Sequence, residues 1–371
     1  MKKIFWLSGE PSGDLHASYV LKELSDKNIY HFGIGGKLMQ NEGLNPILPF
    51  ENFSVMGFIE VLKHLPFFLN AEKKIIQAII ETKPDLVILI DYPGLNMRVA
   101  EKAKKMGFKV LYYIAPQFWA WKKKRLIKLK RFTDHICHIL LFEEQYFKAK
   151  QINSTYVGHP IAEEIEVQFS REEFADKYSL DLNKKWIGFL PGSRKTEIGK
   201  ILPIFLRSAS LMDDNKFEFI FSQADSADIS FFVYPEFTKA NFHLIKGNNY
   251  EIMKHCDFLS VTSGTATIET AFLGTPFIIV YKVNPLSYEI GKRIIKIKRI
   301  GLPNIILDDD ILPEFIQKDV NPHNISKTIL HFLNDQDEYL KIKNKLKGLA
   351  SVLGNKKASH ETAKIIRQLI Q

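Results

Sequence analysis

Short, unbroken apolar segments alternate with stretches of helical spacing in two successive series, and this pattern constrains the fold more than any other feature. The first series lies at residues 3–8, 31–34, 86–90, 110–114 and 136–141. The second lies at residues 186–190, 217–221, 242–245, 258–261 and 276–281. Strands buried on both faces of a parallel sheet carry such continuous apolar runs. We therefore predict two α/β domains built from strand–helix–strand units with right-handed crossovers.

A charged interlude at residues 163–185 separates the two series, and a helical, basic stretch follows the second from Pro322 onward. The predicted division is a Rossmann-like domain at residues 1–165, a second at residues 166–325, and C-terminal helices at residues 326–371. We expect these helices to pack back on the N-terminal domain or on a dimer partner. Two such domains facing each other form a cleft at the carboxyl ends of their strands, where ligands of these sheets bind.

Charge and cysteine content restrict the setting of the chain. A formal net charge of +9 favours an anionic partner, such as nucleic acid, a phosphorylated substrate or an acidic membrane surface, although ordinary solubility explains it equally well. The cysteines, Cys137 and Cys256, lack metal-binding or disulfide spacing and suit a reducing cytoplasm. We expect neither a signal peptide nor a membrane span, because the N-terminal apolar run is short and no stretch of about 18 uncharged apolar residues occurs.

The turn after the first predicted strand, residues 8–14, contains two glycines and two serines. Such a turn lets a ligand approach the backbone closely, and the following helix offers free N–H groups to an anion. The candidate substrate-binding residues are Ser12, Gly13 and Asp14. A plain tight turn in which Asp14 caps a helix is an equally good interpretation. The turn lacks GxGxxG spacing, which disfavours a nicotinamide dinucleotide.

Asp91 directly follows the predicted strand at residues 86–90, so we expect its carboxylate at the carboxyl end of the sheet. A partly desolvated aspartate there can have a raised pKa and act as a general base. The competing interpretation is an aspartate that caps a helix or stabilises a turn. Trp119 and Trp121 stand beside a basic run at residues 122–131, which suits a sugar or phosphate but is equally typical of core aromatics next to a solvated helix.

Two turns of the second domain are suited to phosphate binding, because small residues there leave backbone N–H groups free and an arginine is close. The residues of these turns are Ser193, Arg194, Ser263, Gly264 and Thr265. Glu269, one helical turn later, can accept hydrogen bonds from a ribose diol, or it can be a surface or capping glutamate. Together they indicate a nucleoside diphosphate. No pair of aspartates with metal-binding spacing follows a strand, and we predict no metal.

Residues 56–69 carry apolar side chains at helical spacing, with Lys63, Lys73 and Lys74 nearby. An apolar arc of this kind beside cations can sink into a lipid interface. A buried core helix has the same periodicity, so that interpretation stays open. The candidate membrane-docking residues are Phe58, Val61, Leu62, Leu65 and Phe68.

Nine short segments, taken in order and spacing, resemble the lipid-A-disaccharide synthase family, and they span most of the chain. They are SGEPSGD (8–14), GGKLM (35–39), VMGFIEVL (55–62), IDYPGLN (90–96), APQFWAW (115–121), VGHP (157–160), LPGSR (190–194), SGTATIE (263–269) and GLPNII (301–306). The resemblance implies an inverting glycosyltransferase of the GT-B fold that binds peripherally at the cytoplasmic face of the inner membrane. It implies an acceptor- and lipid-binding first domain and a UDP-sugar-binding second domain.

The resemblance also implies the substrates and the roles of particular residues. The donor would be UDP-2,3-diacylglucosamine and the acceptor 2,3-diacylglucosamine 1-phosphate, called lipid X, giving a β-1,6-linked disaccharide 1-phosphate without a metal or a cofactor. The aspartate that matches Asp91 is the suspected base in this family. Asn304 joins Arg194, Ser263, Gly264, Thr265 and Glu269 around the UDP group. The family allows a homodimer.

Two other classes of protein fit part of the pattern. A UDP-sugar 2-epimerase shares the two-domain fold, but its acidic and histidine residues are arranged differently and it needs no apolar docking arc. A nucleic-acid-binding protein gathers cations and stacking aromatics on one face. Here the basic clusters at residues 122–131 and 292–299 are separate, so we expect no nucleic-acid partner.

Overall fold

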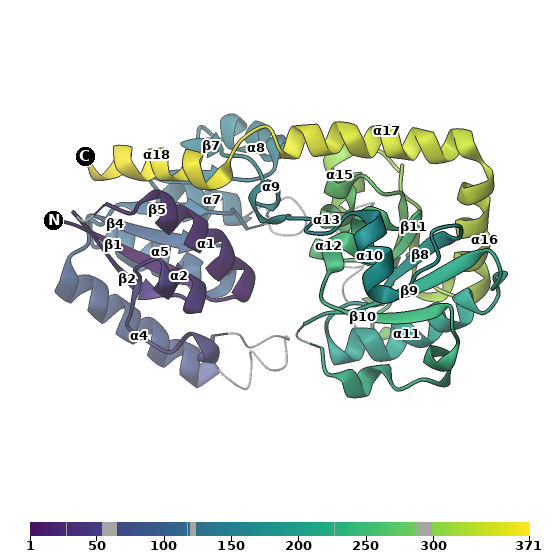
Figure 1. Cartoon of the computed structure of the whole chain (residues 1–371). Helices are drawn as coiled ribbons and strands as arrows, with labels where there is room; N and C mark the ends of the chain where they lie inside the picture. The colour runs from purple at the N-terminus through teal and green to yellow at the C-terminus, as the bar shows by residue number, and fades with distance from the viewer. Residues whose placement is uncertain are drawn as a thin grey trace. The chain divides into compact units, whose positions relative to one another are not determined.

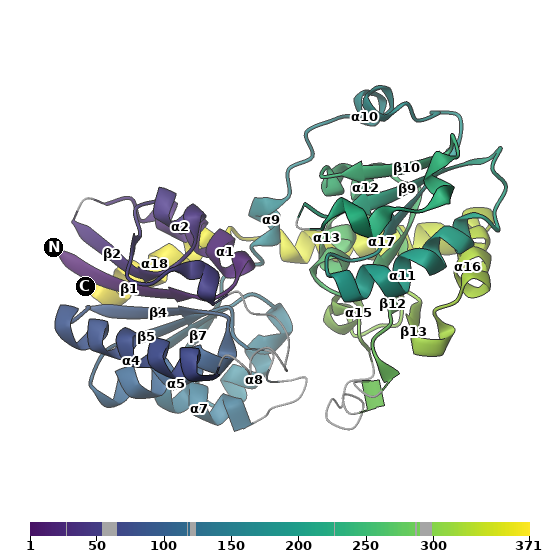
Figure 2. The same cartoon turned by 90° about the horizontal axis from the view of Figure 1, so that it is seen from below.

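The computed structural model describes residues 1–26, 28–53, 65–116, 118, 124–225, 227–285, 288–289 and 299–371. The chain forms two compact units: unit 1 comprises Met1–Pro160 with Asn355–Gln371, and unit 2 comprises Ile161–Gly354. Each unit contains one parallel sheet with helices on both of its faces, as Figure 1 and Figure 2 show. The predicted α/β class with two Rossmann-like sheets is confirmed.

The sheet of unit 1 has the strand order β3-β2-β1-β4-β5-β6-β7, and its neighbouring strands run parallel. The strands are β1 (Lys2–Ser8), β2 (Ile29–Ile34), β3 (Asn45–Pro46), β4 (Leu86–Ile90), β5 (Val110–Tyr113), β6 (His135–His138) and β7 (Ser154–Tyr156). The helices of the described residues are α1 (Pro11–Glu23), α2 (Lys37–Asn41), α4 (Leu65–Thr82), α5 (Pro93–Lys105), α7 (Lys124–Phe132), α8 (Glu144–Ala149) and α18 (Ala358–Ile370).

Strand β1 shows why the sequence of this sheet is continuously apolar. Phe5 and Leu7 belong to the core layer that α4 and α5 cover, whereas Ile4 and Trp6 belong to the opposite layer with α1 and α18. Because both faces are covered, neither set of alternating side chains reaches water. Helix α18, the yellow helix at the C-terminal end in Figure 1, lies along α1 and closes this second layer.

The sheet of unit 2 has the strand order β10-β9-β8-β11-β12-β13 and is also parallel. The strands are β8 (Lys185–Leu190), β9 (Phe217–Gln223), β10 (Phe242–Lys246), β11 (Phe258–Thr262), β12 (Phe277–Tyr281) and β13 (Glu314–Ile316). The helices of the described residues are α9 (Ile161–Glu164), α10 (Arg171–Tyr178), α11 (Lys195–Ala209), α12 (Asn249–His255), α13 (Thr265–Leu273), α15 (Leu302–Leu307), α16 (Pro322–Asn334) and α17 (Gln336–Leu353).

The C-terminal helices are shared between the units. Helix α16 packs against α11 and α17 packs against α13, so both contribute to the core of unit 2. After Gly354 the chain continues into unit 1, where α18 packs on α1. Within the described residues, no helix combines the length and the apolar character needed to cross a bilayer.

Strand order reverses at one point in each sheet, between β1 and β4 in unit 1 and between β8 and β11 in unit 2. Loops on either side of such a point diverge and leave a crevice at the carboxyl ends of the strands, where ligands of doubly wound sheets bind. The turns that follow these strands contain the motifs at residues 8–14, 90–96, 190–194 and 263–269. Topology therefore places the candidate residues where binding is expected.

All ten predicted strands are present, with ends that shift by a few residues. The strand predicted at residues 136–141 ends at His138, because a short 3-10 helix occupies Leu141–Glu143. The predicted strand 110–114 stops at Tyr113, since Ile114 has a left-handed backbone with φ 63°. Strands β3, β7 and β13 were not predicted, because each has only two or three residues and no apolar run.

Candidate functional site

Asp91 lies at the carboxyl end of β4, beside the point where the sheet of unit 1 reverses its order. Its backbone N–H still donates to the carbonyl of Tyr113 on β5 at 3.0 Å, so the residue extends the ladder by one bond. The chain then bends sharply, because Asp91 and Tyr92 both have positive φ, at 42° and 44°. Helix α5 starts at Pro93, whose fixed φ suits the first helical position.

The turn after β1 packs directly against this bend. A side chain at Gly9 would place its Cβ 2.6 Å from Cδ1 of Tyr92, so a residue with a side chain cannot occupy position 9 without displacing the ring. The hydroxyl of Tyr92 donates to the carbonyl of Phe53 at 3.0 Å. Burial, and then the charge of Glu10, raise the pKa of Tyr92 to about 12, so this phenol stays protonated at neutral pH. The loops after β1 and β4 thus form one packed surface.

The predicted substrate residues of the first turn have different environments. Ser12 is exposed in the first turn of α1, and Gly13 is buried against Ser8. Asp14 is buried, and its carboxylate accepts hydrogen bonds from the backbone N–H groups of Leu38 and Met39, each at 3.2 Å. Asp14 therefore caps α2, a helix 24 residues further along the chain, rather than the helix to which it belongs. Its carboxylate already has partners, so it is a weaker candidate for substrate contact than Ser12.

Unit 2 contains a pocket of about 660 Å³ at the carboxyl ends of its central strands. Six of the seven residues predicted in this unit line it: Ser193, Arg194, Ser263, Gly264, Thr265 and Glu269. They come from the turns after β8 and β11, which flank the reversal of strand order. The volume lies in the range of small-molecule sites.

Local backbone geometry explains how these two turns form an anion site. Gly192 has φ 99°, a conformation that favours glycine, and it lets the chain turn back from β8 into α11. Helix α13 starts at Thr265, and its N-cap residue, Gly264, has no side chain that could cap the first N–H groups. Uncapped N–H groups at a helix start carry partial positive charge and suit an oxyanion. The pocket therefore offers backbone donors to a phosphate.

Carboxylates are numerous in this pocket, and they affect one another. Burial, and secondarily the charge of Glu164, raise the pKa of Glu269 to about 7. Arg194 is the cation among the described residues that line the pocket, and its Nη1 lies 2.8 Å from Oε1 of Glu197. A diphosphate would therefore meet a half-protonated glutamate, backbone N–H groups and an arginine that already has a carboxylate partner.

Several lining residues were not predicted from the sequence. They come from the start of α12, from the end of β9 and the loop after it, and from the C-terminus of α9 and the segment after it: Asn248, Asn249, Tyr250, Glu251, Ser222, Asp225, Glu164 and Glu166. The residues at the start of α12 could have been predicted from the sequence, because they follow a Gly–Asn pair that is typical of a turn after a strand. Gly247 and Asn248 form such a left-handed turn, with φ 67° and 50°, directly after β10. Glu164 and Glu166 carry no such signal, because they reach the pocket from outside the sheet.

Asn304 is not among the residues that line this pocket. It is buried in α15, where its Nδ2 donates to the carbonyl of Leu312 at 2.8 Å and to Oε1 of Glu314 at 2.9 Å. Its Oδ1 accepts from the backbone N–H of Leu312 at 3.0 Å. The whole amide is thus engaged in joining α15 to β13, which is a structural role in this unit.

The candidate docking segment is only partly described. Phe58, Val61 and Leu62 lie outside the described residues, as does the side chain of Leu65. Phe68 is 5% exposed, and its ring packs 5.4 Å from Phe67 and 6.4 Å from Tyr92, measured between centroids. The expectation that Phe68 contacts lipid is therefore corrected: this side chain belongs to the core of unit 1, as the buried-helix interpretation predicts.

Other sequence candidates lie outside the described residues or in the core. Trp119 and Trp121 are not described. Cys137 and Cys256 are free and buried, and burial strongly raises the pKa of both thiols. Neither cysteine is thus available as a reactive thiolate.

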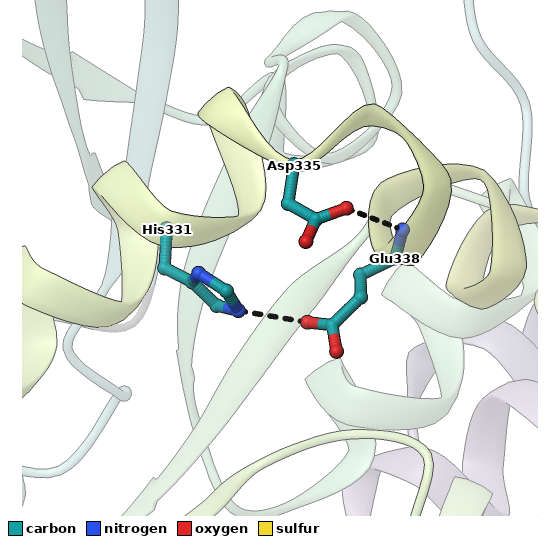
Figure 3. Close-up of side chains that lie close together, drawn as sticks. All are labelled: His331, Asp335 and Glu338. Atoms are coloured by element: carbon teal, nitrogen blue, oxygen red, sulfur yellow. Dashed lines mark hydrogen bonds and ion pairs between the residues drawn. The ribbon is translucent and has the colours of Figure 1, made fainter.

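One group of potential metal ligands is found among the described residues, at the junction of α16 and α17 (Figure 3). Asp335 accepts from the backbone N–H of Glu338 at 3.0 Å and so caps α17. Glu338 in turn pairs with Nε2 of His331 at 2.8 Å. Helix capping and an exposed hydrogen bond between side chains explain this arrangement without a metal, and its residues do not line the pocket of unit 2.

Comparison with known proteins gives consistent results. A family profile described as "Lipid-A-disaccharide synthetase" matches residues 4–370. The chain is 36% identical over 387 residues to the lipid-A-disaccharide synthase of Sulfurihydrogenibium sp. (strain YO3AOP1), covering 100% of this chain and 99% of that protein. For the synthase of Trichlorobacter lovleyi the identity is 33% over 375 residues, covering 100% and 98%.

Two solved structures illustrate the fold. The calicheamicin glycosyltransferase CalG4 gives a TM-score of 0.66 at 12% identity, covering 100% of this chain and 98% of that chain. The UDP-GlcNAc 2-epimerase from Neisseria meningitidis bound to UDP-GlcNAc gives a TM-score of 0.65 at 13% identity, covering 99% and 100%. At such low identity these similarities show the fold alone, which is that of two-domain glycosyltransferases of the GT-B type.

Proposed function

The chain belongs to the lipid-A-disaccharide synthase family, and from that premise we propose how its residues perform glycosyl transfer. It is a glycosyltransferase of lipid A biosynthesis. The proposed donor is UDP-2,3-diacylglucosamine and the proposed acceptor is 2,3-diacylglucosamine 1-phosphate, lipid X. The products are then the β-1,6-linked disaccharide 1-phosphate and UDP. The family match over residues 4–370 is the observation that carries this conclusion.

The pocket of unit 2 is the proposed site of the UDP group. Its backbone donors at Gly192–Ser193 and at the start of α13 suit the two phosphates. Arg194 is placed to neutralise the diphosphate, and Glu269 to accept from the ribose hydroxyls. This assignment needs no metal, because an arginine and oriented N–H groups can stabilise the same charge.

Asp91 is the proposed general base. Its carboxylate takes the proton of the acceptor 6-hydroxyl while that oxygen attacks the anomeric carbon of the donor. The bond between the anomeric carbon and the β-phosphate oxygen breaks, and UDP leaves with the electron pair, which inverts the anomeric configuration. Negative charge grows on the departing phosphate, where Arg194 and the N-terminus of α13 would stabilise the transition state.

The substrates suggest that catalysis takes place at a lipid surface. Each acyl CH₂ group moved into water costs about 0.8 kcal/mol, so diacylated sugars remain in a membrane. We propose peripheral binding at the cytoplasmic face of the inner membrane through residues 56–69 and nearby lysines. Among the described side chains of this segment, Leu69 is 47% exposed, and Lys73 is exposed one turn later on α4. Leu69 and Lys73 therefore take the place of Phe68 as the residues whose substitution tests the proposed docking surface.

A UDP-release assay tests the proposed function. The full chain is incubated with UDP-2,3-diacylglucosamine in mixed micelles, with and without lipid X, and UDP is measured together with the lipid product. We expect UDP and disaccharide to appear in equal amounts and only when lipid X is present. UDP formation that ignores lipid X, or epimerisation of the donor sugar without UDP release, would contradict the proposal.

A further inference from the structure

The turn between β4 and α5 has an unusual backbone. Asp91 and Tyr92 are adjacent non-glycine residues with φ 42° and 44°, in the left-handed region that such residues rarely adopt. A strained backbone persists only where the surrounding structure holds it, and such strain concentrates at functional sites. Because Asp91 is the proposed base, the groups that hold this turn also set the position of its carboxylate.

Two side chains converge on the carbonyl of Asp91. Asn96, in the first turns of α5, donates from Nδ2 to the carbonyl of Asp91 at 2.8 Å and to that of Ile90 at 2.9 Å. The hydroxyl of Tyr112, on the adjacent strand β5, donates to the same Asp91 carbonyl at 2.6 Å. The bend is thus tied both to the helix that follows it and to the neighbouring strand.

The side chain of Asn96 is poorly explained by stability alone. It is 0% exposed, and within the described part of the chain its Oδ1 has no hydrogen-bond partner. A buried carbonyl oxygen without a donor destabilises the folded state. What the amide supplies is a pair of N–H donors directed at the two consecutive carbonyls of the bend. An aliphatic residue has no donor, and an ionised aspartate would present only acceptors to these carbonyls.

We propose that Asn96 and Tyr112 are positioning residues that lock the strained turn and so aim the Asp91 carboxylate at the acceptor hydroxyl. The inference rests on the proposed function of Asp91 as the base. Both side chains are buried, so neither is expected to touch a substrate. A base displaced by about an ångström leaves substrate binding intact but transfers the proton poorly, and the loss therefore falls on kcat rather than KM.

A double-mutant cycle on the full chain tests this inference. The variants are Asn96→Ala, Asp91→Asn and the double variant, assayed for lipid X-dependent UDP release and for UDP affinity by calorimetry. We expect Asn96→Ala to lower kcat about 10- to 100-fold, with the donor KM and the UDP Kd unchanged within about twofold. In the Asp91→Asn background the same substitution should lower kcat by less than about twofold, because the group that Asn96 positions is gone.

Asn241→Ala is a matched control for the loss of a buried amide. Asn241 is buried in unit 2, and its Nδ2 donates to the carbonyl of Phe217 at 3.4 Å, away from both candidate sites. This variant should change the thermal unfolding temperature while leaving kcat close to the wild-type value. If it lowers kcat as much as Asn96→Ala does, the effect is general destabilisation and the positioning role is overturned.

Two further results would overturn the inference: wild-type kcat in Asn96→Ala, or an equal loss of kcat in the wild-type and Asp91→Asn backgrounds. Near-normal kcat in Asp91→Asn is a different result, because it removes the proposed base itself. If Asn96→Ala does not fold, Tyr112→Phe removes one hydroxyl from the same carbonyl and keeps the ring. A loss of kcat confined to the background that retains Asp91 supports the positioning role, and an unchanged kcat contradicts it.

Discussion

Arg194 and Glu197 form an ion pair inside the pocket of unit 2, with Nη1 and Oε1 2.8 Å apart. Arg194 is the N-cap residue of α11, and Glu197 lies three positions later in the first turn of that helix. The diphosphate proposed to bind here must therefore compete with the Glu197 carboxylate for the guanidinium group. This relationship makes the strength of UDP binding depend on a residue that the reaction itself does not use.

Glu197→Gln should strengthen UDP binding. The substitution removes the carboxylate that competes for Arg194 and also one negative charge near the diphosphate. Exposed pairs of this kind contribute little, so we expect a gain of about 1 kcal/mol, roughly fivefold in Kd. Isothermal titration calorimetry with UDP at low and high salt measures the effect, which should shrink as salt increases. Weaker binding in this variant would show that Glu197 helps the site rather than competing with the ligand.

Arg194→Ala should weaken UDP binding by roughly 2–4 kcal/mol, because a charge-assisted contact to the diphosphate is lost. Arg207→Ala is the matched control, since Arg207 is exposed on the same helix and does not line the pocket. Calorimetry on both variants separates a specific contact from the general effect of removing one positive charge. Equal UDP affinities for the two variants would refute the assignment of Arg194.

Glu269 should make UDP binding depend on pH. Burial and the charge of Glu164 raise its pKa to about 7, so the free site is largely protonated at pH 6 and ionised at pH 8. If the ionised carboxylate accepts from the ribose, UDP binding must first remove that proton at low pH. We expect binding about tenfold weaker at pH 6 than at pH 8. UDP itself titrates in this range, and this contribution is the same for both proteins. Once it is removed, the ratio of the UDP affinities at pH 8 and pH 6 should be close to one for Glu269→Gln.

The same shift predicts the stability of the ligand-free protein. A carboxyl whose folded-state pKa is raised contributes most below its ordinary value of 4.5, and this contribution is lost as pH rises through about 7. At pH 8 the buried charge therefore destabilises the folded state, by on the order of 3 kcal/mol. Glu269→Gln should unfold at a higher temperature than the wild type at pH 8, and the difference should disappear near pH 4. An equal difference at both pH values would show that the glutamate does not titrate in this way.

Leu69→Glu should weaken membrane binding in liposome flotation with vesicles containing anionic phospholipid. The substitution places a charge on an exposed apolar position of α4 next to exposed Lys73, without touching the core that holds Phe68. Leu182→Glu is the control, because Leu182 in unit 2 is exposed to the same extent, 47% for both residues. We expect a several-fold lower bound fraction for Leu69→Glu only. Equal flotation of the two variants and the wild type would exclude this face of α4 from docking.

The sequence predicts the fold well where a strand is buried on both faces of a sheet, because such a strand consists of a continuous run of apolar residues. Phe5 and Trp6 point to opposite core layers, and both layers leave the same signature. The signature fails for β3 and β13, since Asn45–Pro46 is exposed and Glu314–Ile316 only partly buried. The periodicity of the sequence could not show whether Phe68 faces lipid or the core. The residue that decides this, Tyr92, packs against Phe68 but lies 24 positions away in the sequence.

Residues that line the pocket are predictable where a strand ends in a turn of small residues, as for Ser193 and Thr265. They are not predictable where a long-range contact decides the role. Asp14 caps α2, a helix formed by later residues. The side-chain amide of Asn304 hydrogen-bonds to the backbone of the segment before β13. Glu164 reaches the pocket from a helix outside the sheet.

The kinetic consequence of Asp91→Asn tests the central claim most directly. The substitution keeps the size of the side chain and removes its basicity, and a general base typically contributes about 100- to 10,000-fold to the rate. With lipid X and UDP-2,3-diacylglucosamine at saturation, we predict a kcat lower by that factor, an unchanged UDP Kd and an unchanged unfolding temperature. A folded variant that binds UDP normally and retains near-wild-type kcat would contradict the account.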